Sequence, residues 1–176
     1  MRLKGGDVAF FSNVLDELTA LQANNIPFEI IPGVTAASGA SAYAGIPLTA
    51  RGYAQGVQFI AFNPNHDLYN EQWEAITSSG NTLVFYMAAK NVIDLSKTLL
   101  HYLKDPATPL AVIEQATTIH QQITVTNLKD CESDFSGLSF SSPSLVIVGE
   151  VVALNTQFNW FSPSTSGTVF DELDNK

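Results

Sequence analysis

The chain has 176 residues, of which 45% are hydrophobic and only 14% are charged, against a usual charged share of about 25%. This apolar content is ample for a packed core and excludes disorder over the whole length. Seventeen acidic and eight basic residues give a formal charge of −9 with no basic run, which argues against a nucleic-acid-binding protein. The single cysteine, Cys131, excludes an internal disulfide and a cysteine-rich metal cluster.

Targeting and membrane signals are also missing from the sequence. No apolar stretch is long enough to span a bilayer, and charged residues follow Met1 where a signal peptide would turn apolar. We therefore expect an acidic globular protein of the cytoplasm with no membrane partner. The residues after 161 are mostly Ser, Thr, Gly, Pro and acids, which predicts a disordered tail at 162–176.

The first part of the chain predicts a strand, a helix and a second strand. Residues 2–4 are typical of a strand end, and a strand end with nothing before it predicts that the chain begins inside a domain. Apolar side chains at helical spacing predict a helix from Val14 that ends at Asn24, with acids in its first turn. Residues 28–31 predict a short strand. This alternation is typical of an α/β fold with a parallel sheet.

The remainder of the chain continues the α/β pattern. A run of small residues predicts a helix whose backbone can be approached closely. Four apolar segments predict strands, and a fifth alternates apolar and polar residues. In chain order the predictions are a helix at 34–44, a strand at 57–62, a turn at 63–65, a helix at 71–77, a strand at 82–87, a helix at 92–103, paired strands at 110–114 and 123–126, and a closing strand at 144–154.

Two glycine turns connect predicted strands to predicted helices. In the Gly-Gly-Asp turn at residues 5–7, glycine lets the backbone approach a ligand, and free N–H groups can hold a carboxylate or hydroxyl. The turn at 32–37 offers the donors and the positive dipole end of a helix N-terminus. Each turn also has a purely structural interpretation. The turn at 5–7 can be only a tight connection, and the turn at 32–37 can serve only the close packing of a small-residue helix on a sheet. The residues alone leave these alternatives open.

The other chemistry-bearing side chains form no metal or nucleophile motif. The histidines are isolated, and no pattern of histidines and acids has metal-ligand spacing. Cys131 lies in a predicted acidic loop beside Asp130 and Glu132, whose charge raises a thiol pKa and disfavours a nucleophile. Four aromatic side chains fit core positions. The histidines are His66, His101 and His120, and the aromatics are Phe59, Phe62, Phe85 and Tyr86.

Five sequence blocks occur in one order over most of the chain. Each block is short, but five in register are specific. Together they resemble the tetrapyrrole methylase family, and within it the uroporphyrinogen-III C-methyltransferases. The blocks are RLKGGD at 2–7, IPGVTAASG at 31–39, YAGIPLT at 43–49, LVFYM at 83–87 and VGEVV at 148–152.

The resemblance implies a fold and a reaction. The fold is tetrapyrrole methylase-like α/β: residues 1–32 would be the end of the N-terminal α/β domain, and 33–161 a C-terminal mixed-sheet α/β domain. The cofactor S-adenosylmethionine (SAM) would lie in the cleft between the domains of a homodimer, with S-adenosylhomocysteine as product. The reaction would be C-methylation of uroporphyrinogen III to precorrin-2, on the way to sirohaem or cobalamin.

The resemblance also assigns roles to individual residues. Eight positions match cofactor contacts of the family, and one basic residue matches a position near the tetrapyrrole substrate. No residue is assigned as catalytic or as a metal ligand. The cofactor positions are Gly5, Gly6, Asp7, Phe10, Thr35, Ala36, Met87 and Ala116, and the substrate position is Arg2.

The sequence departs from the family pattern in ways that leave alternatives to an active methyltransferase. The resemblance covers only the later part of the family sequence, without the stretch that carries the proposed acid/base residues. Val8, the segment 12–15, Ala50 and Ala116 replace family residues. We therefore expect a truncated methyltransferase chain. The alternatives are a non-catalytic remnant that acts as a dimerisation or interaction module, and a methylase of another precorrin.

Overall fold

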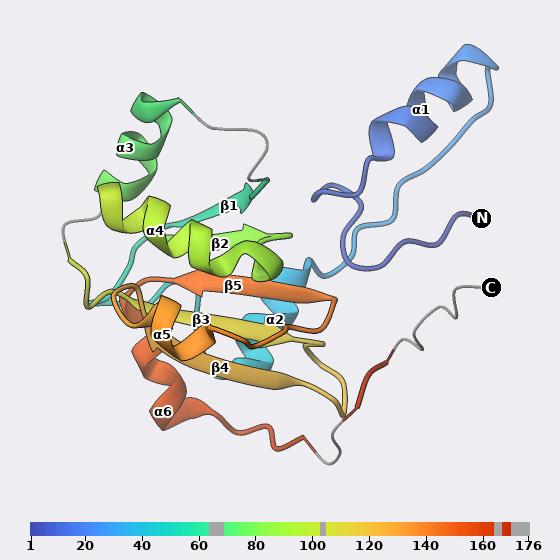
Figure 1. Cartoon of the computed structure of the whole chain (residues 1–176). Helices are drawn as coiled ribbons and strands as arrows, with labels where there is room; N and C mark the ends of the chain where they lie inside the picture. Colours follow the sequence, from blue (N-terminus) through green and yellow to red (C-terminus); the bar gives the residue numbers. More distant parts are fainter. Residues whose placement is uncertain (64–68, 103–104, 164–166, 170–176) are drawn as a thin grey trace.

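The computed structural model describes residues 1–63, 69–102, 105–163 and 167–169. At its centre lies a five-stranded sheet in the order β1-β2-β5-β3-β4 (Figure 1). The strands are β1 (Val57–Ala61), β2 (Thr82–Tyr86), β3 (Pro109–Glu114), β4 (Gln122–Asn127) and β5 (Ser144–Val148).

The strand directions bring three chain segments to one edge of the sheet. β1 and β2 are parallel, whereas β5 is antiparallel to both of its neighbours, β2 and β3. Because Tyr86 and Ile113 both lie opposite Leu145 of β5, the ends of β2 and β3 are level. We call this side, where Ala61, Tyr86 and Glu114 end their strands, the carboxyl edge.

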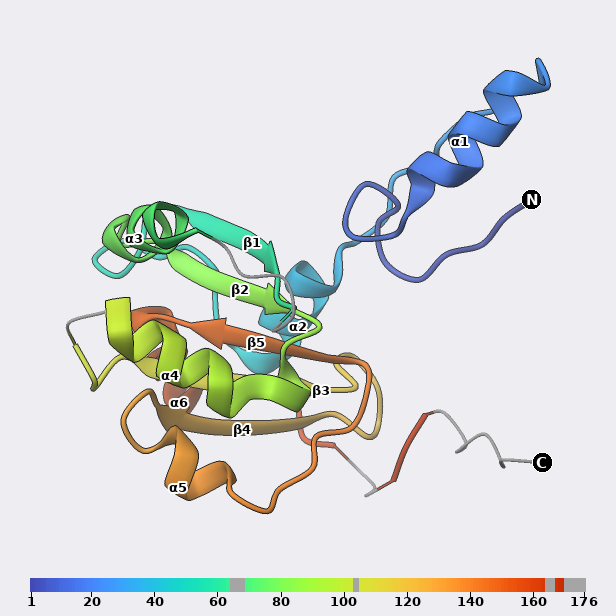
Figure 2. The same cartoon turned by 45° about the horizontal axis from the view of Figure 1, so that its top comes forward.

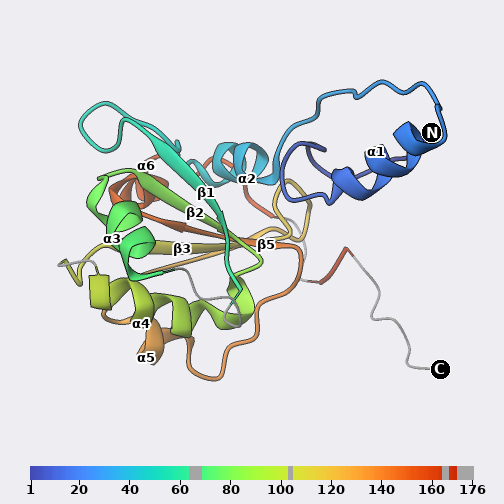
Figure 3. The ribbon, with the colours of Figure 1, turned by 90° about the horizontal axis from the view of Figure 1, so that it is seen from above.

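Helices cover both faces of the sheet. α3 (Asn70–Ser78), α4 (Val92–Tyr102) and α5 (Cys131–Phe135) lie on one face, with the short 3-10 helix η1 (Ala89–Asn91) before α4. The other face carries α2 (Ala36–Ala44), η2 (Glu150–Leu154) and α6 (Asn155–Phe158), as Figure 3 shows from above. α1 (Val14–Ala23) projects away from both layers (Figure 2).

Strand alternation builds a separate core on each face. In β2, Phe85 packs with the α3 and α4 side chains, whereas its neighbour Val84 packs on the α2 side. β3 divides in the same way between Val112 and Ile113. Successive side chains of a strand point to opposite faces, so a strand covered on both faces is apolar throughout.

The small residues of α2 set its distance from the sheet. Ala37, Ala40 and Ala44 recur every three to four residues and are fully buried, so they form one helical face without bulky side chains. Gly45 ends the helix with a φ of 61°, which glycine adopts without strain. A Cβ at Gly45 would lie 2.2 Å from the carbonyl oxygen of Phe158, so a side chain cannot be placed there.

The structure confirms the mixed α/β fold and most of the predicted elements. The helix of small residues, the helices at 14–23, 70–78 and 92–102, and the strands at 57–61 and 82–86 are all present. The predicted pairing of 110–114 with 123–126 is also present, as β3 and β4 with Ile113 opposite Ile123.

Four local predictions are wrong. Residues 2–4 and 28–31 are not strands, because neither segment has a ladder partner in the described part of the chain. The closing strand ends at Val148 rather than at 154, since Gly149, with a φ of 140°, turns the chain into η2. Cys131 is not in a loop but is the buried first residue of α5.

Some predictions fall outside the described residues. These are most of the turn at 63–65, the last residue of the helix at 92–103, His66, and much of the tail at 162–176. The division of the chain at residues 32 and 33 stays a prediction, although no described residue before Ala37 is buried. Within the described residues, no helix has the length and apolar character needed to cross a membrane.

Replacing Phe85 by alanine should lower the free energy of unfolding by about 3–5 kcal/mol, because its fully buried ring would leave a cavity between the sheet and its helices. The matched control is Phe28→Ala, which removes the same atoms from a residue that is 50% exposed and should cost less than about 1 kcal/mol. Urea unfolding followed by circular dichroism measures both. Equal losses would contradict the burial pattern.

Candidate cofactor site

The two glycine turns of the sequence touch in the structure. The Gly33 N–H donates to Oδ2 of Asp7 over 2.9 Å, and the Ala9 N–H donates to Oδ1 over 2.7 Å. A Cβ at Gly33 would lie 2.3 Å from the carbonyl oxygen of Gly6, a separation that real Cβ atoms do not show. The turns at 5–7 and 33–36 therefore meet through their backbones, and only glycine fits at position 33.

Asp7 holds this contact as a carboxylate. The N–H groups of Ala9 and Gly33 lower the pKa of Asp7 below its usual value, with Ala9 the larger influence. Hydrogen bonds to the charged form of an acid favour that form. Asp7 is thus a structural anion that joins the turns.

Tyr86 joins the end of β2 to the start of α2. Its hydroxyl oxygen accepts a hydrogen bond of 3.1 Å from the Ala37 N–H and shares one of 2.6 Å with Oγ1 of Thr35. Thr35 is the N-cap residue of α2, but its own side chain does not cap the helix. The Tyr86 hydroxyl therefore supplies an acceptor that an N-cap side chain usually provides.

Aromatic rings attach residues 1–35, which we call the arm, to the sheet. The ring centroids of Phe11 and Tyr86 are 4.5 Å apart, and those of Phe10 and Phe59 are 5.6 Å apart in an edge-to-face arrangement. Phe59 also meets Tyr86 at 6.1 Å. Such distances are typical of favourable ring pairs. Phe59 and Tyr86 are thus half-buried contacts for the arm, whereas Phe62 and Phe85 lie in the core as predicted.

Met87 and Ala116 follow the ends of β2 and β3 at the carboxyl edge, with β5 between these two strands. Met87 comes directly after β2, has a φ of 60° and is 64% exposed. Ala116 lies between Gln115 and Thr117, whose φ values are 47° and 69°. Residues other than glycine seldom adopt such values, and they persist where the surrounding structure holds them.

The loop at 115–121 is held from two sides. The Gln115 N–H donates to the carbonyl oxygen of Pro143 over 2.7 Å. The Gln121 side chain accepts from the Thr117 N–H over 2.8 Å and donates to the carbonyl oxygen of Tyr43, on α2, over 3.2 Å. This loop therefore lies against the same helix whose first turn contacts Tyr86.

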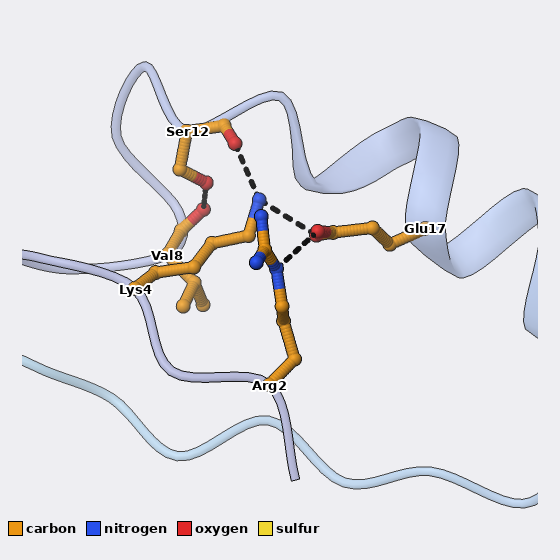
Figure 4. A network of polar contacts seen from close by, with 5 residues as sticks. All are labelled: Arg2, Lys4, Val8, Ser12 and Glu17. Carbon is orange, nitrogen blue, oxygen red and sulfur yellow. Dashed lines mark hydrogen bonds and ion pairs between the residues drawn. The ribbon is translucent and has the colours of Figure 1, made fainter.

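Arg2 lies on the arm beside α1, as Figure 4 shows. Its Nε is 2.9 Å from Oε1 of Glu17, and Nζ of Lys4 is 2.6 Å from Oε2 of the same carboxylate. Lys4 also donates to the carbonyl oxygen of Ser12, whose hydroxyl donates to that of Val8. The hydrogen bond from Lys4, followed by that from Arg2, lowers the pKa of Glu17. Arg2 thus lies on the same arm as Gly5, Gly6, Asp7 and Phe10, with its side chain paired to Glu17.

The arrangement offers backbone donors and apolar walls. No described residue accepts a hydrogen bond from the N–H of Gly5, Gly6 or Ala36, and the space where a Cβ of Gly5 would lie is open. Helix N-termini and glycine turns with free N–H groups bind carboxylates and hydroxyls. Phe10 and Met87 add exposed apolar surface. A ligand with a carboxylate, hydroxyls and an uncharged ring fits these donors and walls.

Other candidate chemistry is weaker. Burial raises the pKa of the Cys131 thiol, and Asp134 and Glu132 raise it further, which disfavours a nucleophile as the sequence predicts. Within the described ranges, no group of three or more His, Cys, Asp or Glu could hold a metal ion. Two surface hollows lie elsewhere, one between α4 and α5 and one near the start of β2, and neither is lined by a predicted cofactor residue.

Sequence reasoning identified the two turns but missed the residues that connect them to the fold. Tyr86 carried only a core signal, because its partners Thr35 and Ala37 lie far away in the sequence. Phe11 carried no signal. Gln121 could have been suspected as a polar residue directly before an alternating strand, but its bond to Tyr43 depends on the packing of α2.

The fold and this edge define a class: a mixed α/β protein that presents backbone donors from two touching glycine turns beside two strand ends. The family model described as tetrapyrrole (corrin/porphyrin) methylases matches residues 1–132. The chain belongs to the tetrapyrrole methylase family.

Similar proteins agree with this membership. A sirohaem synthase of Edwardsiella ictaluri is 42% identical over 161 residues, which is 92% of this chain and 34% of that protein. A crystal structure of uroporphyrin-III C-methyltransferase from Thermus thermophilus has a TM-score of 0.74 and 33% identity, and the match covers 89% of this chain and 66% of that one. A second structure of the Thermus enzyme, complexed with S-adenosylhomocysteine, has a TM-score of 0.71 and 30% identity, over 86% and 63% of the two chains.

The chain is shorter than these relatives. It spans about a third of the length of the curated sirohaem synthases that it matches. It spans 63% of the Thermus methyltransferase solved with S-adenosylhomocysteine.

A pH titration tests the role of Asp7. Its pKa is lowered in the folded chain, so the turn contact should be complete above the ordinary value of 3.8 and be lost as the pH falls through the lowered pKa. The Gly33 amide proton, followed by NMR, should report a midpoint below 3.8. Asp7→Asn should abolish this titration, whereas Asp16→Asn on α1 should leave it unchanged. A midpoint at or above the ordinary value would contradict this role.

Tyr86→Phe should lower the free energy of unfolding by about 1 kcal/mol, because it removes the hydroxyl that accepts from Ala37 but keeps the ring. The control is Tyr53→Phe, since the structure gives the Tyr53 hydroxyl no hydrogen bond among the described residues. Thermal unfolding of both variants gives the comparison. An equal effect of the two substitutions would show that the hydroxyl of Tyr86 does not stabilise α2.

Proposed function

We propose that this chain forms part of the cofactor cleft for SAM-dependent C-methylation of uroporphyrinogen III to precorrin-2. The observation that carries the proposal is the contact of the turns at 5–7 and 33–36 beside the carboxyl edge. The printed names of the relatives support the substrate, and the Thermus structure with S-adenosylhomocysteine supports the cofactor class.

The residues divide into donors and apolar walls. In the proposal, backbone N–H groups of Gly5, Gly6 and Ala36 hold polar groups of SAM, and Asp7 fixes the turn that presents them. Phe10, Met87 and Ala116 contact its apolar parts, with Thr35 at the start of α2. When bound, the cofactor supplies an activated methyl group. The contribution of the chain is to hold that group in line with the accepting carbon, and alignment can remove several kcal/mol of a barrier.

The tetrapyrrole substrate would require a basic region, since uroporphyrinogen III carries eight carboxylates. Arg2 is the assigned contact, and Lys4 lies beside it. In the free chain both cations are paired with Glu17. Binding of the substrate by Arg2 would therefore exchange this exposed ion pair, which costs little, for a carboxylate of the ligand.

A second function is favoured by the surface of the arm. Its apolar side chains include Leu3, Ile31 and Val34, each more than half exposed. Extended chain without a ladder partner tends to pair with other polypeptide. An interaction or dimerisation role without turnover therefore remains the second candidate, and a second copy of the chain is the proposed partner.

Calorimetric titration with S-adenosylhomocysteine tests the first proposal. The chain should bind with a Kd weaker than about 1 μM, because no described residue before Ala37 is buried and the turns are therefore open to solvent. Gly33→Ala should abolish binding by forcing the turns apart, with thermal unfolding as the control for the fold. Binding that survives Gly33→Ala would contradict the proposed site.

Incubation with SAM and uroporphyrinogen III, read by absorbance, tests whether the chain on its own completes the reaction. We expect the chain on its own to bind the cofactor without forming precorrin-2. Light scattering on the same sample tests pairing of the arm, and a monomer at all concentrations would count against the second function.

A further inference from the structure

Gln115 is a buried polar residue at the carboxyl edge that the proposed function does not use. Its side chain is 1% exposed although it lies in a loop. Its Nε2 donates to the carbonyl oxygen of Gly167 over 3.0 Å, and its Oε1 accepts from the Val169 N–H over 2.7 Å. We call residues 167–169 the strap. The amide of Gln115 thus pairs with both a backbone acceptor and a backbone donor of the strap.

The strap touches the loop at a second point. A Cβ at Gly167, where φ is 152°, would lie 3.1 Å from Cε1 of His120. Residues 115 and 120 flank the segment that carries Ala116. The strap therefore contacts this loop near its beginning and near its end, in addition to the contacts that Pro143 and Gln121 make with it.

The backbone of this loop has a strained conformation that contacts with other segments must stabilise. Gln115 and Thr117 both have positive φ values, which side chains other than glycine adopt at a cost. A buried amide with a satisfied donor and a satisfied acceptor fixes one orientation, whereas leaving either unpaired is unfavourable. Pairing with the strap therefore favours the backbone conformation that residues 115–117 have in the structure, with Gln115 and Thr117 at positive φ.

We propose that Gln115 is a positioning residue and that the strap at 167–169 holds the loop at 115–121 in the conformation that presents Ala116 to the cofactor. The cofactor part of this inference rests on the proposed function. The part that concerns the loop rests on the two hydrogen bonds and the His120 contact alone.

Two truncations test the strap directly. A chain ending at Pro163 lacks the strap, and a chain ending at Val169 keeps it and serves as the matched control. Hydrogen–deuterium exchange of peptides covering 115–121 should be faster in the shorter chain and unchanged in the control. S-adenosylhomocysteine should bind about three- to tenfold more weakly to the shorter chain only, the range expected for one or two hydrogen bonds.

Side-chain variants separate positioning from a general loss of stability. Gln115→Leu should reproduce the shorter chain, because it removes both hydrogen bonds. Gln115→Glu keeps the acceptor for Val169 but loses the donor and places a buried carboxylate oxygen against the carbonyl oxygen of Gly167, so it should loosen the strap at least as much as Gln115→Leu. Thermal unfolding of both variants and of the chain ending at Pro163 measures how much of the change is a general loss of stability.

The outcomes decide between this inference and the proposed function. Unchanged exchange at 115–121 after removal of the strap would overturn the inference, and so would tighter cofactor binding, which would make the strap a competitor. If no variant and not even the full chain binds S-adenosylhomocysteine, the proposed function fails, while the exchange experiment still decides whether the strap holds the loop.

Discussion

The arrangement of the candidate cofactor site depends on one contact between two backbone turns. Gly33 approaches Gly6 so closely that no side chain fits, and the Asp7 carboxylate accepts hydrogen bonds from both sides of the junction. The arm contributes no buried residue to either core. The junction fixes the two turns of the arm against each other, and the arm meets the sheet through the Thr35–Tyr86 hydrogen bond and the ring contacts of Phe10 and Phe11. Burial, which determines the rest of the fold, does not hold the arm.

At the carboxyl edge, consecutive residues make different contacts. Tyr86 ends β2 and caps α2 through its hydroxyl, whereas Met87 directly after it takes a left-handed conformation and lies exposed. At the end of β3, Glu114 and Gln115 turn toward different segments, and the Glu114 carboxylate accepts from the Ser141 N–H over 2.6 Å. The same sheet edge thus supplies both anchoring groups and open surface.

Local patterns made much of the fold predictable. The alanines of α2 recur at helical spacing and Gly45 ends the helix, so its limits follow from adjacent residues. The apolar run of β2 likewise indicates a strand covered on both faces. The failures concern features that need a distant partner or a backbone angle. Residues 28–31 have strand-like letters without a neighbouring strand, and Gly149 ends β5 inside an apolar run.

The candidate site also has a part that the sequence predicts and a part that it does not. Glycine turns are visible in the letters, and the family resemblance gave them a cofactor role. The contacts that connect them to the fold are not visible, because Tyr86 meets Thr35, and Gln115 meets Val169, across long stretches of sequence. A hydroxyl or an amide can serve many purposes, and only the folded chain shows which one applies.

A junction made mainly of main-chain atoms has a consequence for evolution. Side chains around it can be exchanged without altering the amide groups that it displays, which is consistent with Val8, the residue after Asp7, in a chain that keeps the turns. Position 33 has no such freedom, since every other residue would collide with Gly6. Among diverged copies of this chain, loss of that single glycine would therefore mark the point at which the two turns can no longer meet.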